Sequence, residues 1–340
     1  MSQKNSSPSV RDRARGMLVG LAVGDALGAP VEFGYTSQSI AALGDKIEHF
    51  QSSPLGPAGT WTDDTSMALC LADSLIEKNG YDSFDIMGKY RHWMLDGYRT
   101  CDGLPAADVG IQTRIALMDF ADNPYINEDA PKTESAGNGA IMRLDPIVLA
   151  AMQDSDSTAP EERDLAIKLA RLSCRETHDS YMAIAVTEAF ATLLMLCLFY
   201  KNNFSSAVEH CTCWLSRNEG SESCLEKIDH ARTTALESKD GAEFKDRGGY
   251  ILDAFAIAIW GVAHSKSFEE GIINVIRLGG DTDTNAAIYG QLAGVYYGYS
   301  GIPKEWREGV YSSAELVEIA DKLLDMKECP VIRTRFKDEF

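Results

Sequence analysis

Apolar residues recur at helical spacing in four long windows of the chain, residues 14–22, 67–76, 165–172 and 251–259. Recurrence at intervals of three and four residues predicts amphipathic helices. Strict alternation of apolar and polar residues, the pattern of a half-buried strand, is hardly seen. Clusters of Gly, Pro, Ser and Asp predict loops at 51–59, 102–107, 121–137, 154–160 and 239–249. We therefore predict an all-α protein.

The domain organisation follows from length and composition. The 340 residues allow two domains by length alone. However, no repeat of fixed period is seen, and no linker of distinct composition divides the chain. We expect one compact domain over residues 10–340. Residues 1–9 are polar and rich in serine, which predicts a disordered arm and neither a secretory signal nor a membrane anchor.

Charge narrows the classes of partner. The chain has 51 acidic and 32 basic residues, a formal net charge of -19, with 45% hydrophobic residues. Such a protein repels phosphate backbones and anionic lipid, which argues against nucleic-acid and membrane-surface binding. Any phosphate must be held locally, by backbone amides, metal ions or a few placed side chains.

The cysteines and the longest apolar segment bear on the compartment. Of the eight cysteines, Cys211 and Cys213 are the only close pair, and their spacing matches neither a zinc ribbon nor a redox motif. We expect mostly buried thiols in a reducing compartment. The apolar segment 182–200 contains Thr187 and Glu188, which favours a buried core helix over a membrane span. A cytoplasmic location is expected.

The first chemical motif lies at the start of the second apolar window. Thr62, Asp63 and Asp64 follow a Gly-containing loop and directly precede the helical periodicity. Carboxylates at a helix start are favoured by the helix dipole and can cap free amides. The same carboxylates could bind a cation, and the motif alone leaves both interpretations open.

The second motif, residues 277–285, has the same order of turn, oxygen-rich residues and helix. Gly279 and Gly280 mark the turn, Asp281 and Asp283 can converge on one centre, and a helix is expected from about Ala286. Small residues then recur at 286, 287, 290, 293 and 294. They would allow close packing against a neighbouring helix, which gives a reason for glycines inside it.

Together the two motifs offer ligands for hard divalent cations. Such cations take carboxylate, hydroxyl and water oxygens, often with few protein ligands. The motifs lie too far apart in the sequence for one continuous calcium loop, so folding must assemble the site. Four carboxylates suit two metal ions better than one. The candidate ligands are Thr62, Asp63, Asp64, Asp281, Asp283 and Thr284.

Two further stretches contain chemistry of lower specificity. The glycines of residues 16–28 lack a preceding strand and the spacing of a nucleotide-binding loop, so close helix packing explains them, while Glu32 just after Pro30 is a candidate site carboxylate. Residues 135–143 join a Gly-rich turn to an apolar run. This loop could offer amides to an anion or could form a type I′ turn.

Taken together, these stretches resemble the ADP-ribosylglycohydrolase family, especially the branch of the dinitrogenase-reductase-activating glycohydrolase and the ADP-ribosylarginine hydrolases. The similarity spans residues 16–298. Its most specific parts are the Gly-Asp-Ala-Leu-Gly-Ala run at 24–29, Trp-Thr-Asp-Asp-Thr at 61–65, Gly-Asn-Gly at 137–139, Thr-His at 177–178, Gly-Tyr at 249–250 and Gly-Gly-Asp-Thr-Asp-Thr at 279–284.

The resemblance implies a single-domain, orthogonal helical bundle with two Mg²⁺ or Mn²⁺ ions. It favours metal binding over helix capping for the six ligands named above. It also implies catalytic roles for Glu32 and Asp108. The ADP-ribose-binding positions that it implies are Gly137, Asn138, Gly139, Met142, His178 and Tyr250.

The resemblance further implies that the chain hydrolyses ADP-ribose from a modified protein. Trp61 and residues 62–67 look like the arginine-acting bacterial branch. A hydrolase of O-linked ADP-ribose, on serine or as O-acetyl-ADP-ribose, is the first alternative, and a non-catalytic ADP-ribose-binding or structural relative is the second. A regulatory role and protection against an ADP-ribosylating toxin, contacted by residues 1–9, both stay open.

Overall fold

The computed structural model describes residues 7–32, 34–126, 133–152, 160–199, 203–215, 221–326 and 331–335. Nearly all regular structure there is helical, as predicted, with one pair of three-residue strands. In chain order the elements are α1 Val10–Gly28, η1 Ala29–Val31, α2 Ser37–Ala41, η2 Gly44–Glu48, α3 Asp63–Lys78, β1 Gly80–Asp82, α4 Ser83–Asp96, α5 Ile111–Asp122, η3 Asn138–Ala140, α6 Asp145–Ala151, α7 Pro160–Thr177, α8 Tyr181–Phe199, α9 Phe204–His210, α10 Ser221–Glu237, η4 Ala242–Phe244, α11 Ile251–Ala263, α12 Phe268–Arg277, α13 Thr282–Tyr297, η5 Tyr299–Gly301, α14 Lys304–Gly309, α15 Ser313–Leu324 and β2 Val331–Arg333.

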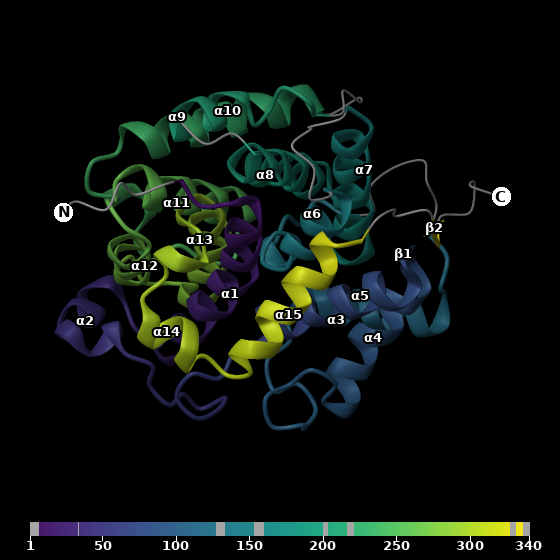
Figure 1. Cartoon of the computed structure of the whole chain (residues 1–340), viewed down its shortest axis with the longest axis horizontal. Helices are drawn as coiled ribbons and strands as arrows, with labels where there is room; N and C mark the ends of the chain where they lie inside the picture. Colours follow the sequence, from purple (N-terminus) through teal and green to yellow (C-terminus); the bar gives the residue numbers. More distant parts are fainter. Residues whose placement is uncertain are drawn as a thin grey trace.

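The helices α1 and α13 lie side by side at the centre, where Figure 1 shows the other helices arranged around them. Glycines explain how closely the two helices approach. A Cβ atom on Gly20 would lie 2.3 Å from the Gly290 carbonyl oxygen, and one on Gly16 would lie 2.3 Å from that of Gly294. These contacts confirm the predicted close packing. The pairing is antiparallel, so the end of α1 meets the start of α13.

A Cβ atom on Gly28 would lie 2.5 Å from the Asp283 Cα atom. The Thr282 hydroxyl also donates to the Gly28 carbonyl oxygen at 2.9 Å. The exit from α1 is thereby held against the first turn of α13. This joint positions Glu32, at the end of η1, beside the second aspartate motif.

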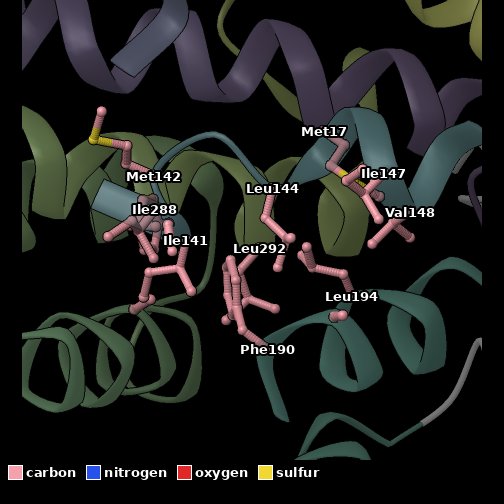
Figure 2. Packing of buried hydrophobic residues seen from close by; sticks show 14 of the residues in the cluster. Met17, Ile141, Met142, Leu144, Ile147, Val148, Phe190, Leu194, Ile288 and Leu292 are labelled. Carbon is pink, nitrogen blue, oxygen red and sulfur yellow. The ribbon is translucent and has the colours of Figure 1, made fainter. Parts of the chain in front are cut away.

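The four apolar windows form α1, α3, α7 and α11, and their apolar faces join one core. Figure 2 shows how the core fixes the segment that follows the Gly-Asn-Gly motif. Ile141 and Leu144 point toward Phe190 of α8 and Leu292 of α13, whereas Met142 extends away from them. Because Ile141 and Leu144 are completely buried, the loop is anchored at its C-terminal end by apolar burial.

Two details differ from the sequence-based expectations. The helix α13 begins at Thr282, earlier than the expected Ala286, so Asp283 and Thr284 lie within its first turn. The strands β1 and β2 pair in parallel, with Tyr81 opposite Ile332, and were not predicted. Such short strands contain too few residues for a period of two to be seen.

The predicted arm falls partly outside the description, because residues 1–6 are not among the described ones. In the described part of the arm, Ser9 caps α1, because its hydroxyl accepts a hydrogen bond from the Asp12 amide. Two helical stretches, Val10–Val31 and Tyr181–Phe199, have the length and apolarity to cross a membrane, but 89% of each apolar window is buried inside the protein. This burial fits the expected core helices. The seven described cysteines are free thiols, and five of them are buried.

Candidate functional site

Two chain segments bring three carboxylates together at the joint between α1 and α13. Glu32 ends η1, Asp281 occupies the N-cap position of α13, and Asp283 lies in its first turn. One carboxylate oxygen from each of the three lies within 4.8 Å of those of the other two. The turn before α13 requires glycine: Gly280 has φ +80°, and a Cβ atom there would lie 2.0 Å from the Arg247 carbonyl oxygen.

The first aspartate motif is held by Asp25, a residue to which the sequence assigned no role. Asp25 is completely buried in α1 and accepts hydrogen bonds from the amide and the hydroxyl of Thr62, both at 2.8 Å. It accepts the amide and hydroxyl of Thr65 as well, at 3.0 and 2.6 Å. Asp25 thus caps α3 from another helix, so Asp63 and Asp64 are not needed as caps.

Burial and mutual repulsion shape the electrostatics of these carboxylates. Burial, with added repulsion from neighbouring carboxylates, holds the pKa values of Asp63, Asp64 and Asp283 well above their usual range. Burial, then the Asp108 carboxylate, raises the pKa of Glu32 to about 7. Without a cation, the folded protein therefore favours protonated forms of these acids.

The same residues fit divalent cations. The Asp64 side chain is inaccessible to solvent, and its Oδ1 atom has no hydrogen-bond partner among the described residues. The Thr62 hydroxyl donates to Asp25 at 2.8 Å, with the Asp64 Oδ2 atom as a more distant acceptor at 3.3 Å, which leaves its oxygen lone pairs free for a ligand role. Close, buried carboxylates and hydroxyls without a lysine or arginine partner are the donor set that Mg²⁺ and Mn²⁺ prefer.

One cavity, of about 450 Å³, is lined by α10 and α11 and lies away from the carboxylates. The second cavity, of about 410 Å³, lies beside the carboxylates and contains most of the predicted site, and we call it the main cavity. Volumes of this size suit a small-molecule ligand. None of the described residues that line the second cavity is a lysine or an arginine. Its lining consists of Glu32, Asp63, Asp108, Gly110, Ile111, Gln112, Thr113, Ser135, Gly137, Asn138, Gly139, Met142, His178, Gly249, Asp281, Asp283 and Thr284.

The Gly-Asn-Gly loop lines this cavity and contacts its carboxylates. The Asn138 amide group donates to the Asp281 carboxylate at 2.8 Å, and the Asn138 backbone amide donates to Gly249 at 2.9 Å. The glycines face the His178 ring, because a Cβ atom on Gly139 would lie 2.6 Å from its Cε1 atom. The loop and the Thr-His motif therefore form one packed unit beside the carboxylates.

The structure settles the conformation of this loop. Residues 138–140 form the 3-10 helix η3, and neither Gly137 nor its neighbours have the positive φ angles of a type I′ turn. The turn interpretation was wrong. The underlying reason is the bridge between Gly137 and Tyr250, which pairs the loop with the segment before α11.

Most predicted positions meet at this cavity, but not all. Tyr250 has 41% of its surface exposed and does not line the cavity, whereas the neighbouring Gly249 does. Thr62 lines a smaller adjoining cavity of about 60 Å³, which shares Asp63 and Asp108 with the main one. The predicted ligand Asp64 is completely buried and lines neither cavity. Gln112 and Thr113 were missed, since isolated polar residues at a helix start give no distinctive signal, whereas Ser135 begins the loop 135–143 that the sequence had singled out.

Comparison with known proteins agrees with this geometry. The family model described as ADP-ribosylglycohydrolase matches residues 6–330. The chain is 29% identical to the ADP-ribosylarginine hydrolase Tri1 of Pseudomonas putida (strain GB-1), covering 92% of this chain and 78% of the relative. It is 31% identical to the ADP-ribosyl-[dinitrogen reductase] glycohydrolase of Rhodospirillum rubrum, over 88% of this chain and 91% of the relative.

Two further matches extend the comparison. The human ADP-ribosylhydrolase ARH3 is 26% identical, over 92% of both chains. A solved structure described as an ADP-ribosylglycohydrolase-related protein complex superposes with a TM-score of 0.72 and 32% identity, covering 94% of this chain and 99% of that one. With a family model that matches almost its whole length, the chain belongs to the ADP-ribosylglycohydrolase family.

Proposed function

We propose that the protein removes ADP-ribose from ADP-ribosylated arginine on a target protein, using two Mg²⁺ or Mn²⁺ ions. The observation that carries the proposal is the meeting of Glu32, Asp281 and Asp283 with the Gly-Asn-Gly loop at one cavity. This arrangement suits a reaction at the ribose end of ADP-ribose. The diphosphate and adenine would extend along the loop.

In this proposal, Thr62, Asp63 and Asp64 hold the ions from α3, and Asp281, Asp283 and Thr284 hold them from α13. When bound, such ions act as Lewis acids and lower the pKa of bound water. The protein positions the two ligand sets through the α1 and α13 contact and through Asp25. Asn138 fixes the orientation of Asp281 by its amide hydrogen bond.

Glu32 and Asp108 are the proposed proton-transfer groups. Both are partly exposed to the cavity, where a side-chain carboxyl group can exchange a proton with water or substrate. In the metal-free protein, burial raises the pKa of both carboxyl groups. One carboxyl group would protonate the departing guanidine nitrogen, while the other would take a proton from the attacking water.

The arginine linkage is supported by the Tri1 relatives from Pseudomonas putida and Serratia proteamaculans, which are named ADP-ribosylarginine hydrolases and are each 29% identical to this chain. The competing function is hydrolysis of an O-linked ADP-ribose at the same site. The cytoplasmic location and a toxin as a binding partner are still predictions. The proposed substrate, an ADP-ribosylated protein, agrees with the hydrolases found among the relatives.

The direct test compares hydrolysis of arginine-linked and serine-linked ADP-ribosyl protein, with Mg²⁺ and with EDTA. We expect the wild-type protein to release ADP-ribose from arginine only. EDTA should abolish this release, and so should Asp63→Ala and Asp283→Ala. Asp229→Asn is the control, because Asp229 pairs with Arg232 at the surface, away from the cavity. Preferential release from serine would replace the substrate assignment, and full activity of both alanine variants in EDTA would refute the metal mechanism.

A further inference from the structure

A buried guanidinium lies directly behind the Gly-Asn-Gly loop. Arg143 is completely buried, and the groups that accept from it are the Tyr90 hydroxyl at 2.9 Å, the Thr177 hydroxyl at 2.7 Å and the Gly139 carbonyl. All three oxygen acceptors are neutral, and no ion pair joins Arg143 to a described carboxylate. Burying a charge without a counter-charge is costly, so a role beyond simple packing is expected.

The hydrogen bonds of Arg143 constrain the next one. A guanidinium only donates, so the Thr177 oxygen must accept from Arg143. The Thr177 hydroxyl hydrogen stays available for the Nδ1 atom of His178, 2.8 Å away, while the second lone pair of the same oxygen can instead accept from Nδ1–H. In the first arrangement Nδ1 accepts, and the neutral imidazole has its hydrogen on Nε2.

His178 is also placed to use that hydrogen. Its ring lines the main cavity and packs on the loop, where a Cβ atom on Gly137 would lie 3.2 Å from Nε2. Burial, followed by repulsion from the Arg143 charge, lowers the pKa of His178 to about 3. The ring is thus neutral at physiological pH, and no described residue accepts a hydrogen bond from Nε2.

We infer that Arg143 and Thr177 are positioning residues that hold His178 as an uncharged Nε2–H donor to an oxygen of the ADP-ribose diphosphate. This inference rests on the proposed function for its ligand. An uncharged donor suits a cavity lined by carboxylates, because it does not form an ion pair with them. The buried Arg143 charge adds positive potential behind the loop, which favours an anionic ligand.

A purely structural role makes a different prediction. If Arg143 and Thr177 only hold the loop in place, the protonated nitrogen of His178 is irrelevant to ligand binding. Thr177→Val keeps the shape but removes the hydroxyl, whereas Thr177→Ser keeps the hydroxyl. Thr192→Val is the matched control, because the Thr192 hydroxyl is equally buried but donates to the Glu188 carbonyl within α8.

The experiment records ¹⁵N spectra of histidine-labelled full-length protein without ligand, and measures ADP-ribose binding by calorimetry. His178→Gln identifies the His178 signals among the six histidines. We expect the Nε2–H tautomer in the wild type and in Thr177→Ser, and a loss of this single tautomer in Thr177→Val. ADP-ribose affinity should fall about tenfold in Thr177→Val and stay unchanged in Thr192→Val.

A wild-type ring with its hydrogen on Nδ1 would overturn the inference. So would a Thr177→Val protein that keeps both the Nε2–H tautomer and the wild-type affinity. If wild-type protein with the expected tautomer bound no ADP-ribose, the proposed function and the ligand role of His178 would both fall. The tautomer is read in the ligand-free protein, so that result is distinguishable from failure of the hydrogen-bond chain itself.

Discussion

The two walls of the main cavity differ in how their polar atoms are satisfied. On the acidic wall, formed by Glu32, Asp63, Asp108, Asp281 and Asp283, burial raises the pKa of every carboxyl group. On the opposite wall, the Gly-Asn-Gly loop is bonded at its backbone, at its side chain and through the groups behind it. Among the described residues, no lysine or arginine forms an ion pair with the acidic wall, whereas the loop is held by hydrogen bonds within the protein.

This difference indicates a division of labour. Carboxylates that repel one another in the folded protein store a preference for cations, so metal binding would stabilise the acidic wall most. A wall whose hydrogen bonds are already made is preorganised and needs little rearrangement when a ligand binds. Asn138 joins the two, because it donates to Asp281 from the loop.

The largest expected effect comes from displacing the acidic wall as a unit. In Gly28→Ala the new methyl group would lie 2.5 Å from the Asp283 Cα atom, a backbone contact that only movement of α13 can relieve. A shift of about 1 Å in a metal ligand should lower kcat/KM by about 100-fold. Steady-state hydrolysis and the melting temperature would both be measured.

The matched control is Gly88→Ala in α4. A Cβ atom on Gly88 meets nothing within 4 Å, and Gly88 lies inside the helix. Replacing a helical glycine by alanine without a clash should stabilise the protein by about 0.5–1 kcal/mol and leave the activity unchanged. Equal activity of the two variants would show that the α1 and α13 contact does not set the site.

An intermediate effect is expected from Asp25, the one carboxylate of this region that is fully hydrogen-bonded. Asp25→Asn keeps a single oxygen for the amides and hydroxyls of Thr62 and Thr65 and adds an NH₂ group that faces donors. Loss of about 2 kcal/mol in the free energy of unfolding is expected, with Mg²⁺ affinity weakened about 10–100-fold.

Asp64→Asn makes the comparison sharper, because Asp64 belongs to the unsatisfied carboxylates. Asparagine does not ionise, so folding in EDTA no longer has to protonate the buried carboxylate, and the free energy of unfolding should rise, opposite in sign to Asp25→Asn. Urea unfolding in EDTA, followed by titration with Mg²⁺, measures both. The same sign for the two variants would refute the division between satisfied and unsatisfied carboxylates.

The sequence predicted those features that local patterns specify. Helical periodicity located α1, α3, α7 and α11, and the shared order of turn, oxygen-rich residues and helix located both aspartate motifs. The glycines at 16–28 predicted a close helix contact but not its partner, since spacing along one helix does not identify the second. The resemblance supplied Asp108, His178 and the roles of the loop residues, which single positions could not.

What the sequence could not predict depends on pairings formed only by folding. Asp25 lies in mid-helix and looks like an ordinary polar interruption, because its partners at Thr62 and Thr65 come from another helix. Arg143 stands beside the Gly-Asn-Gly motif, yet its bond to Thr177 crosses from the loop to the end of α7. Tyr250 is a related case: its backbone pairs with Gly137, but the residue does not line the cavity, so its role in ADP-ribose binding stays a prediction.

The smallest expected effect on metal binding and activity tests whether an unsatisfied carboxyl group always signals a cation. Asp145, at the start of α6, is completely buried, and neither carboxylate oxygen has a partner among the described residues. Unlike the acidic wall, it lines neither the main cavity nor the smaller one beside it. Burial raises the pKa of Asp145 to about 8, so in the folded state this group is a neutral acid.

Because the folded pKa of Asp145 lies above the unfolded value of about 3.9, its contribution to stability is present below that value and is lost as pH rises toward 8. Asp145→Asn removes the titration, so its advantage in the free energy of unfolding over the wild type should grow by about 1 kcal/mol per pH unit between about pH 5 and about pH 8. Urea unfolding across this range, with and without Mg²⁺, measures the advantage. If Mg²⁺ abolishes the stability advantage of Asp145→Asn, Asp145 is coupled to the metal ligands. If the advantage is the same with and without Mg²⁺, Asp145 is a solitary buried acid, distinct from the carboxylates that are clustered to bind ions.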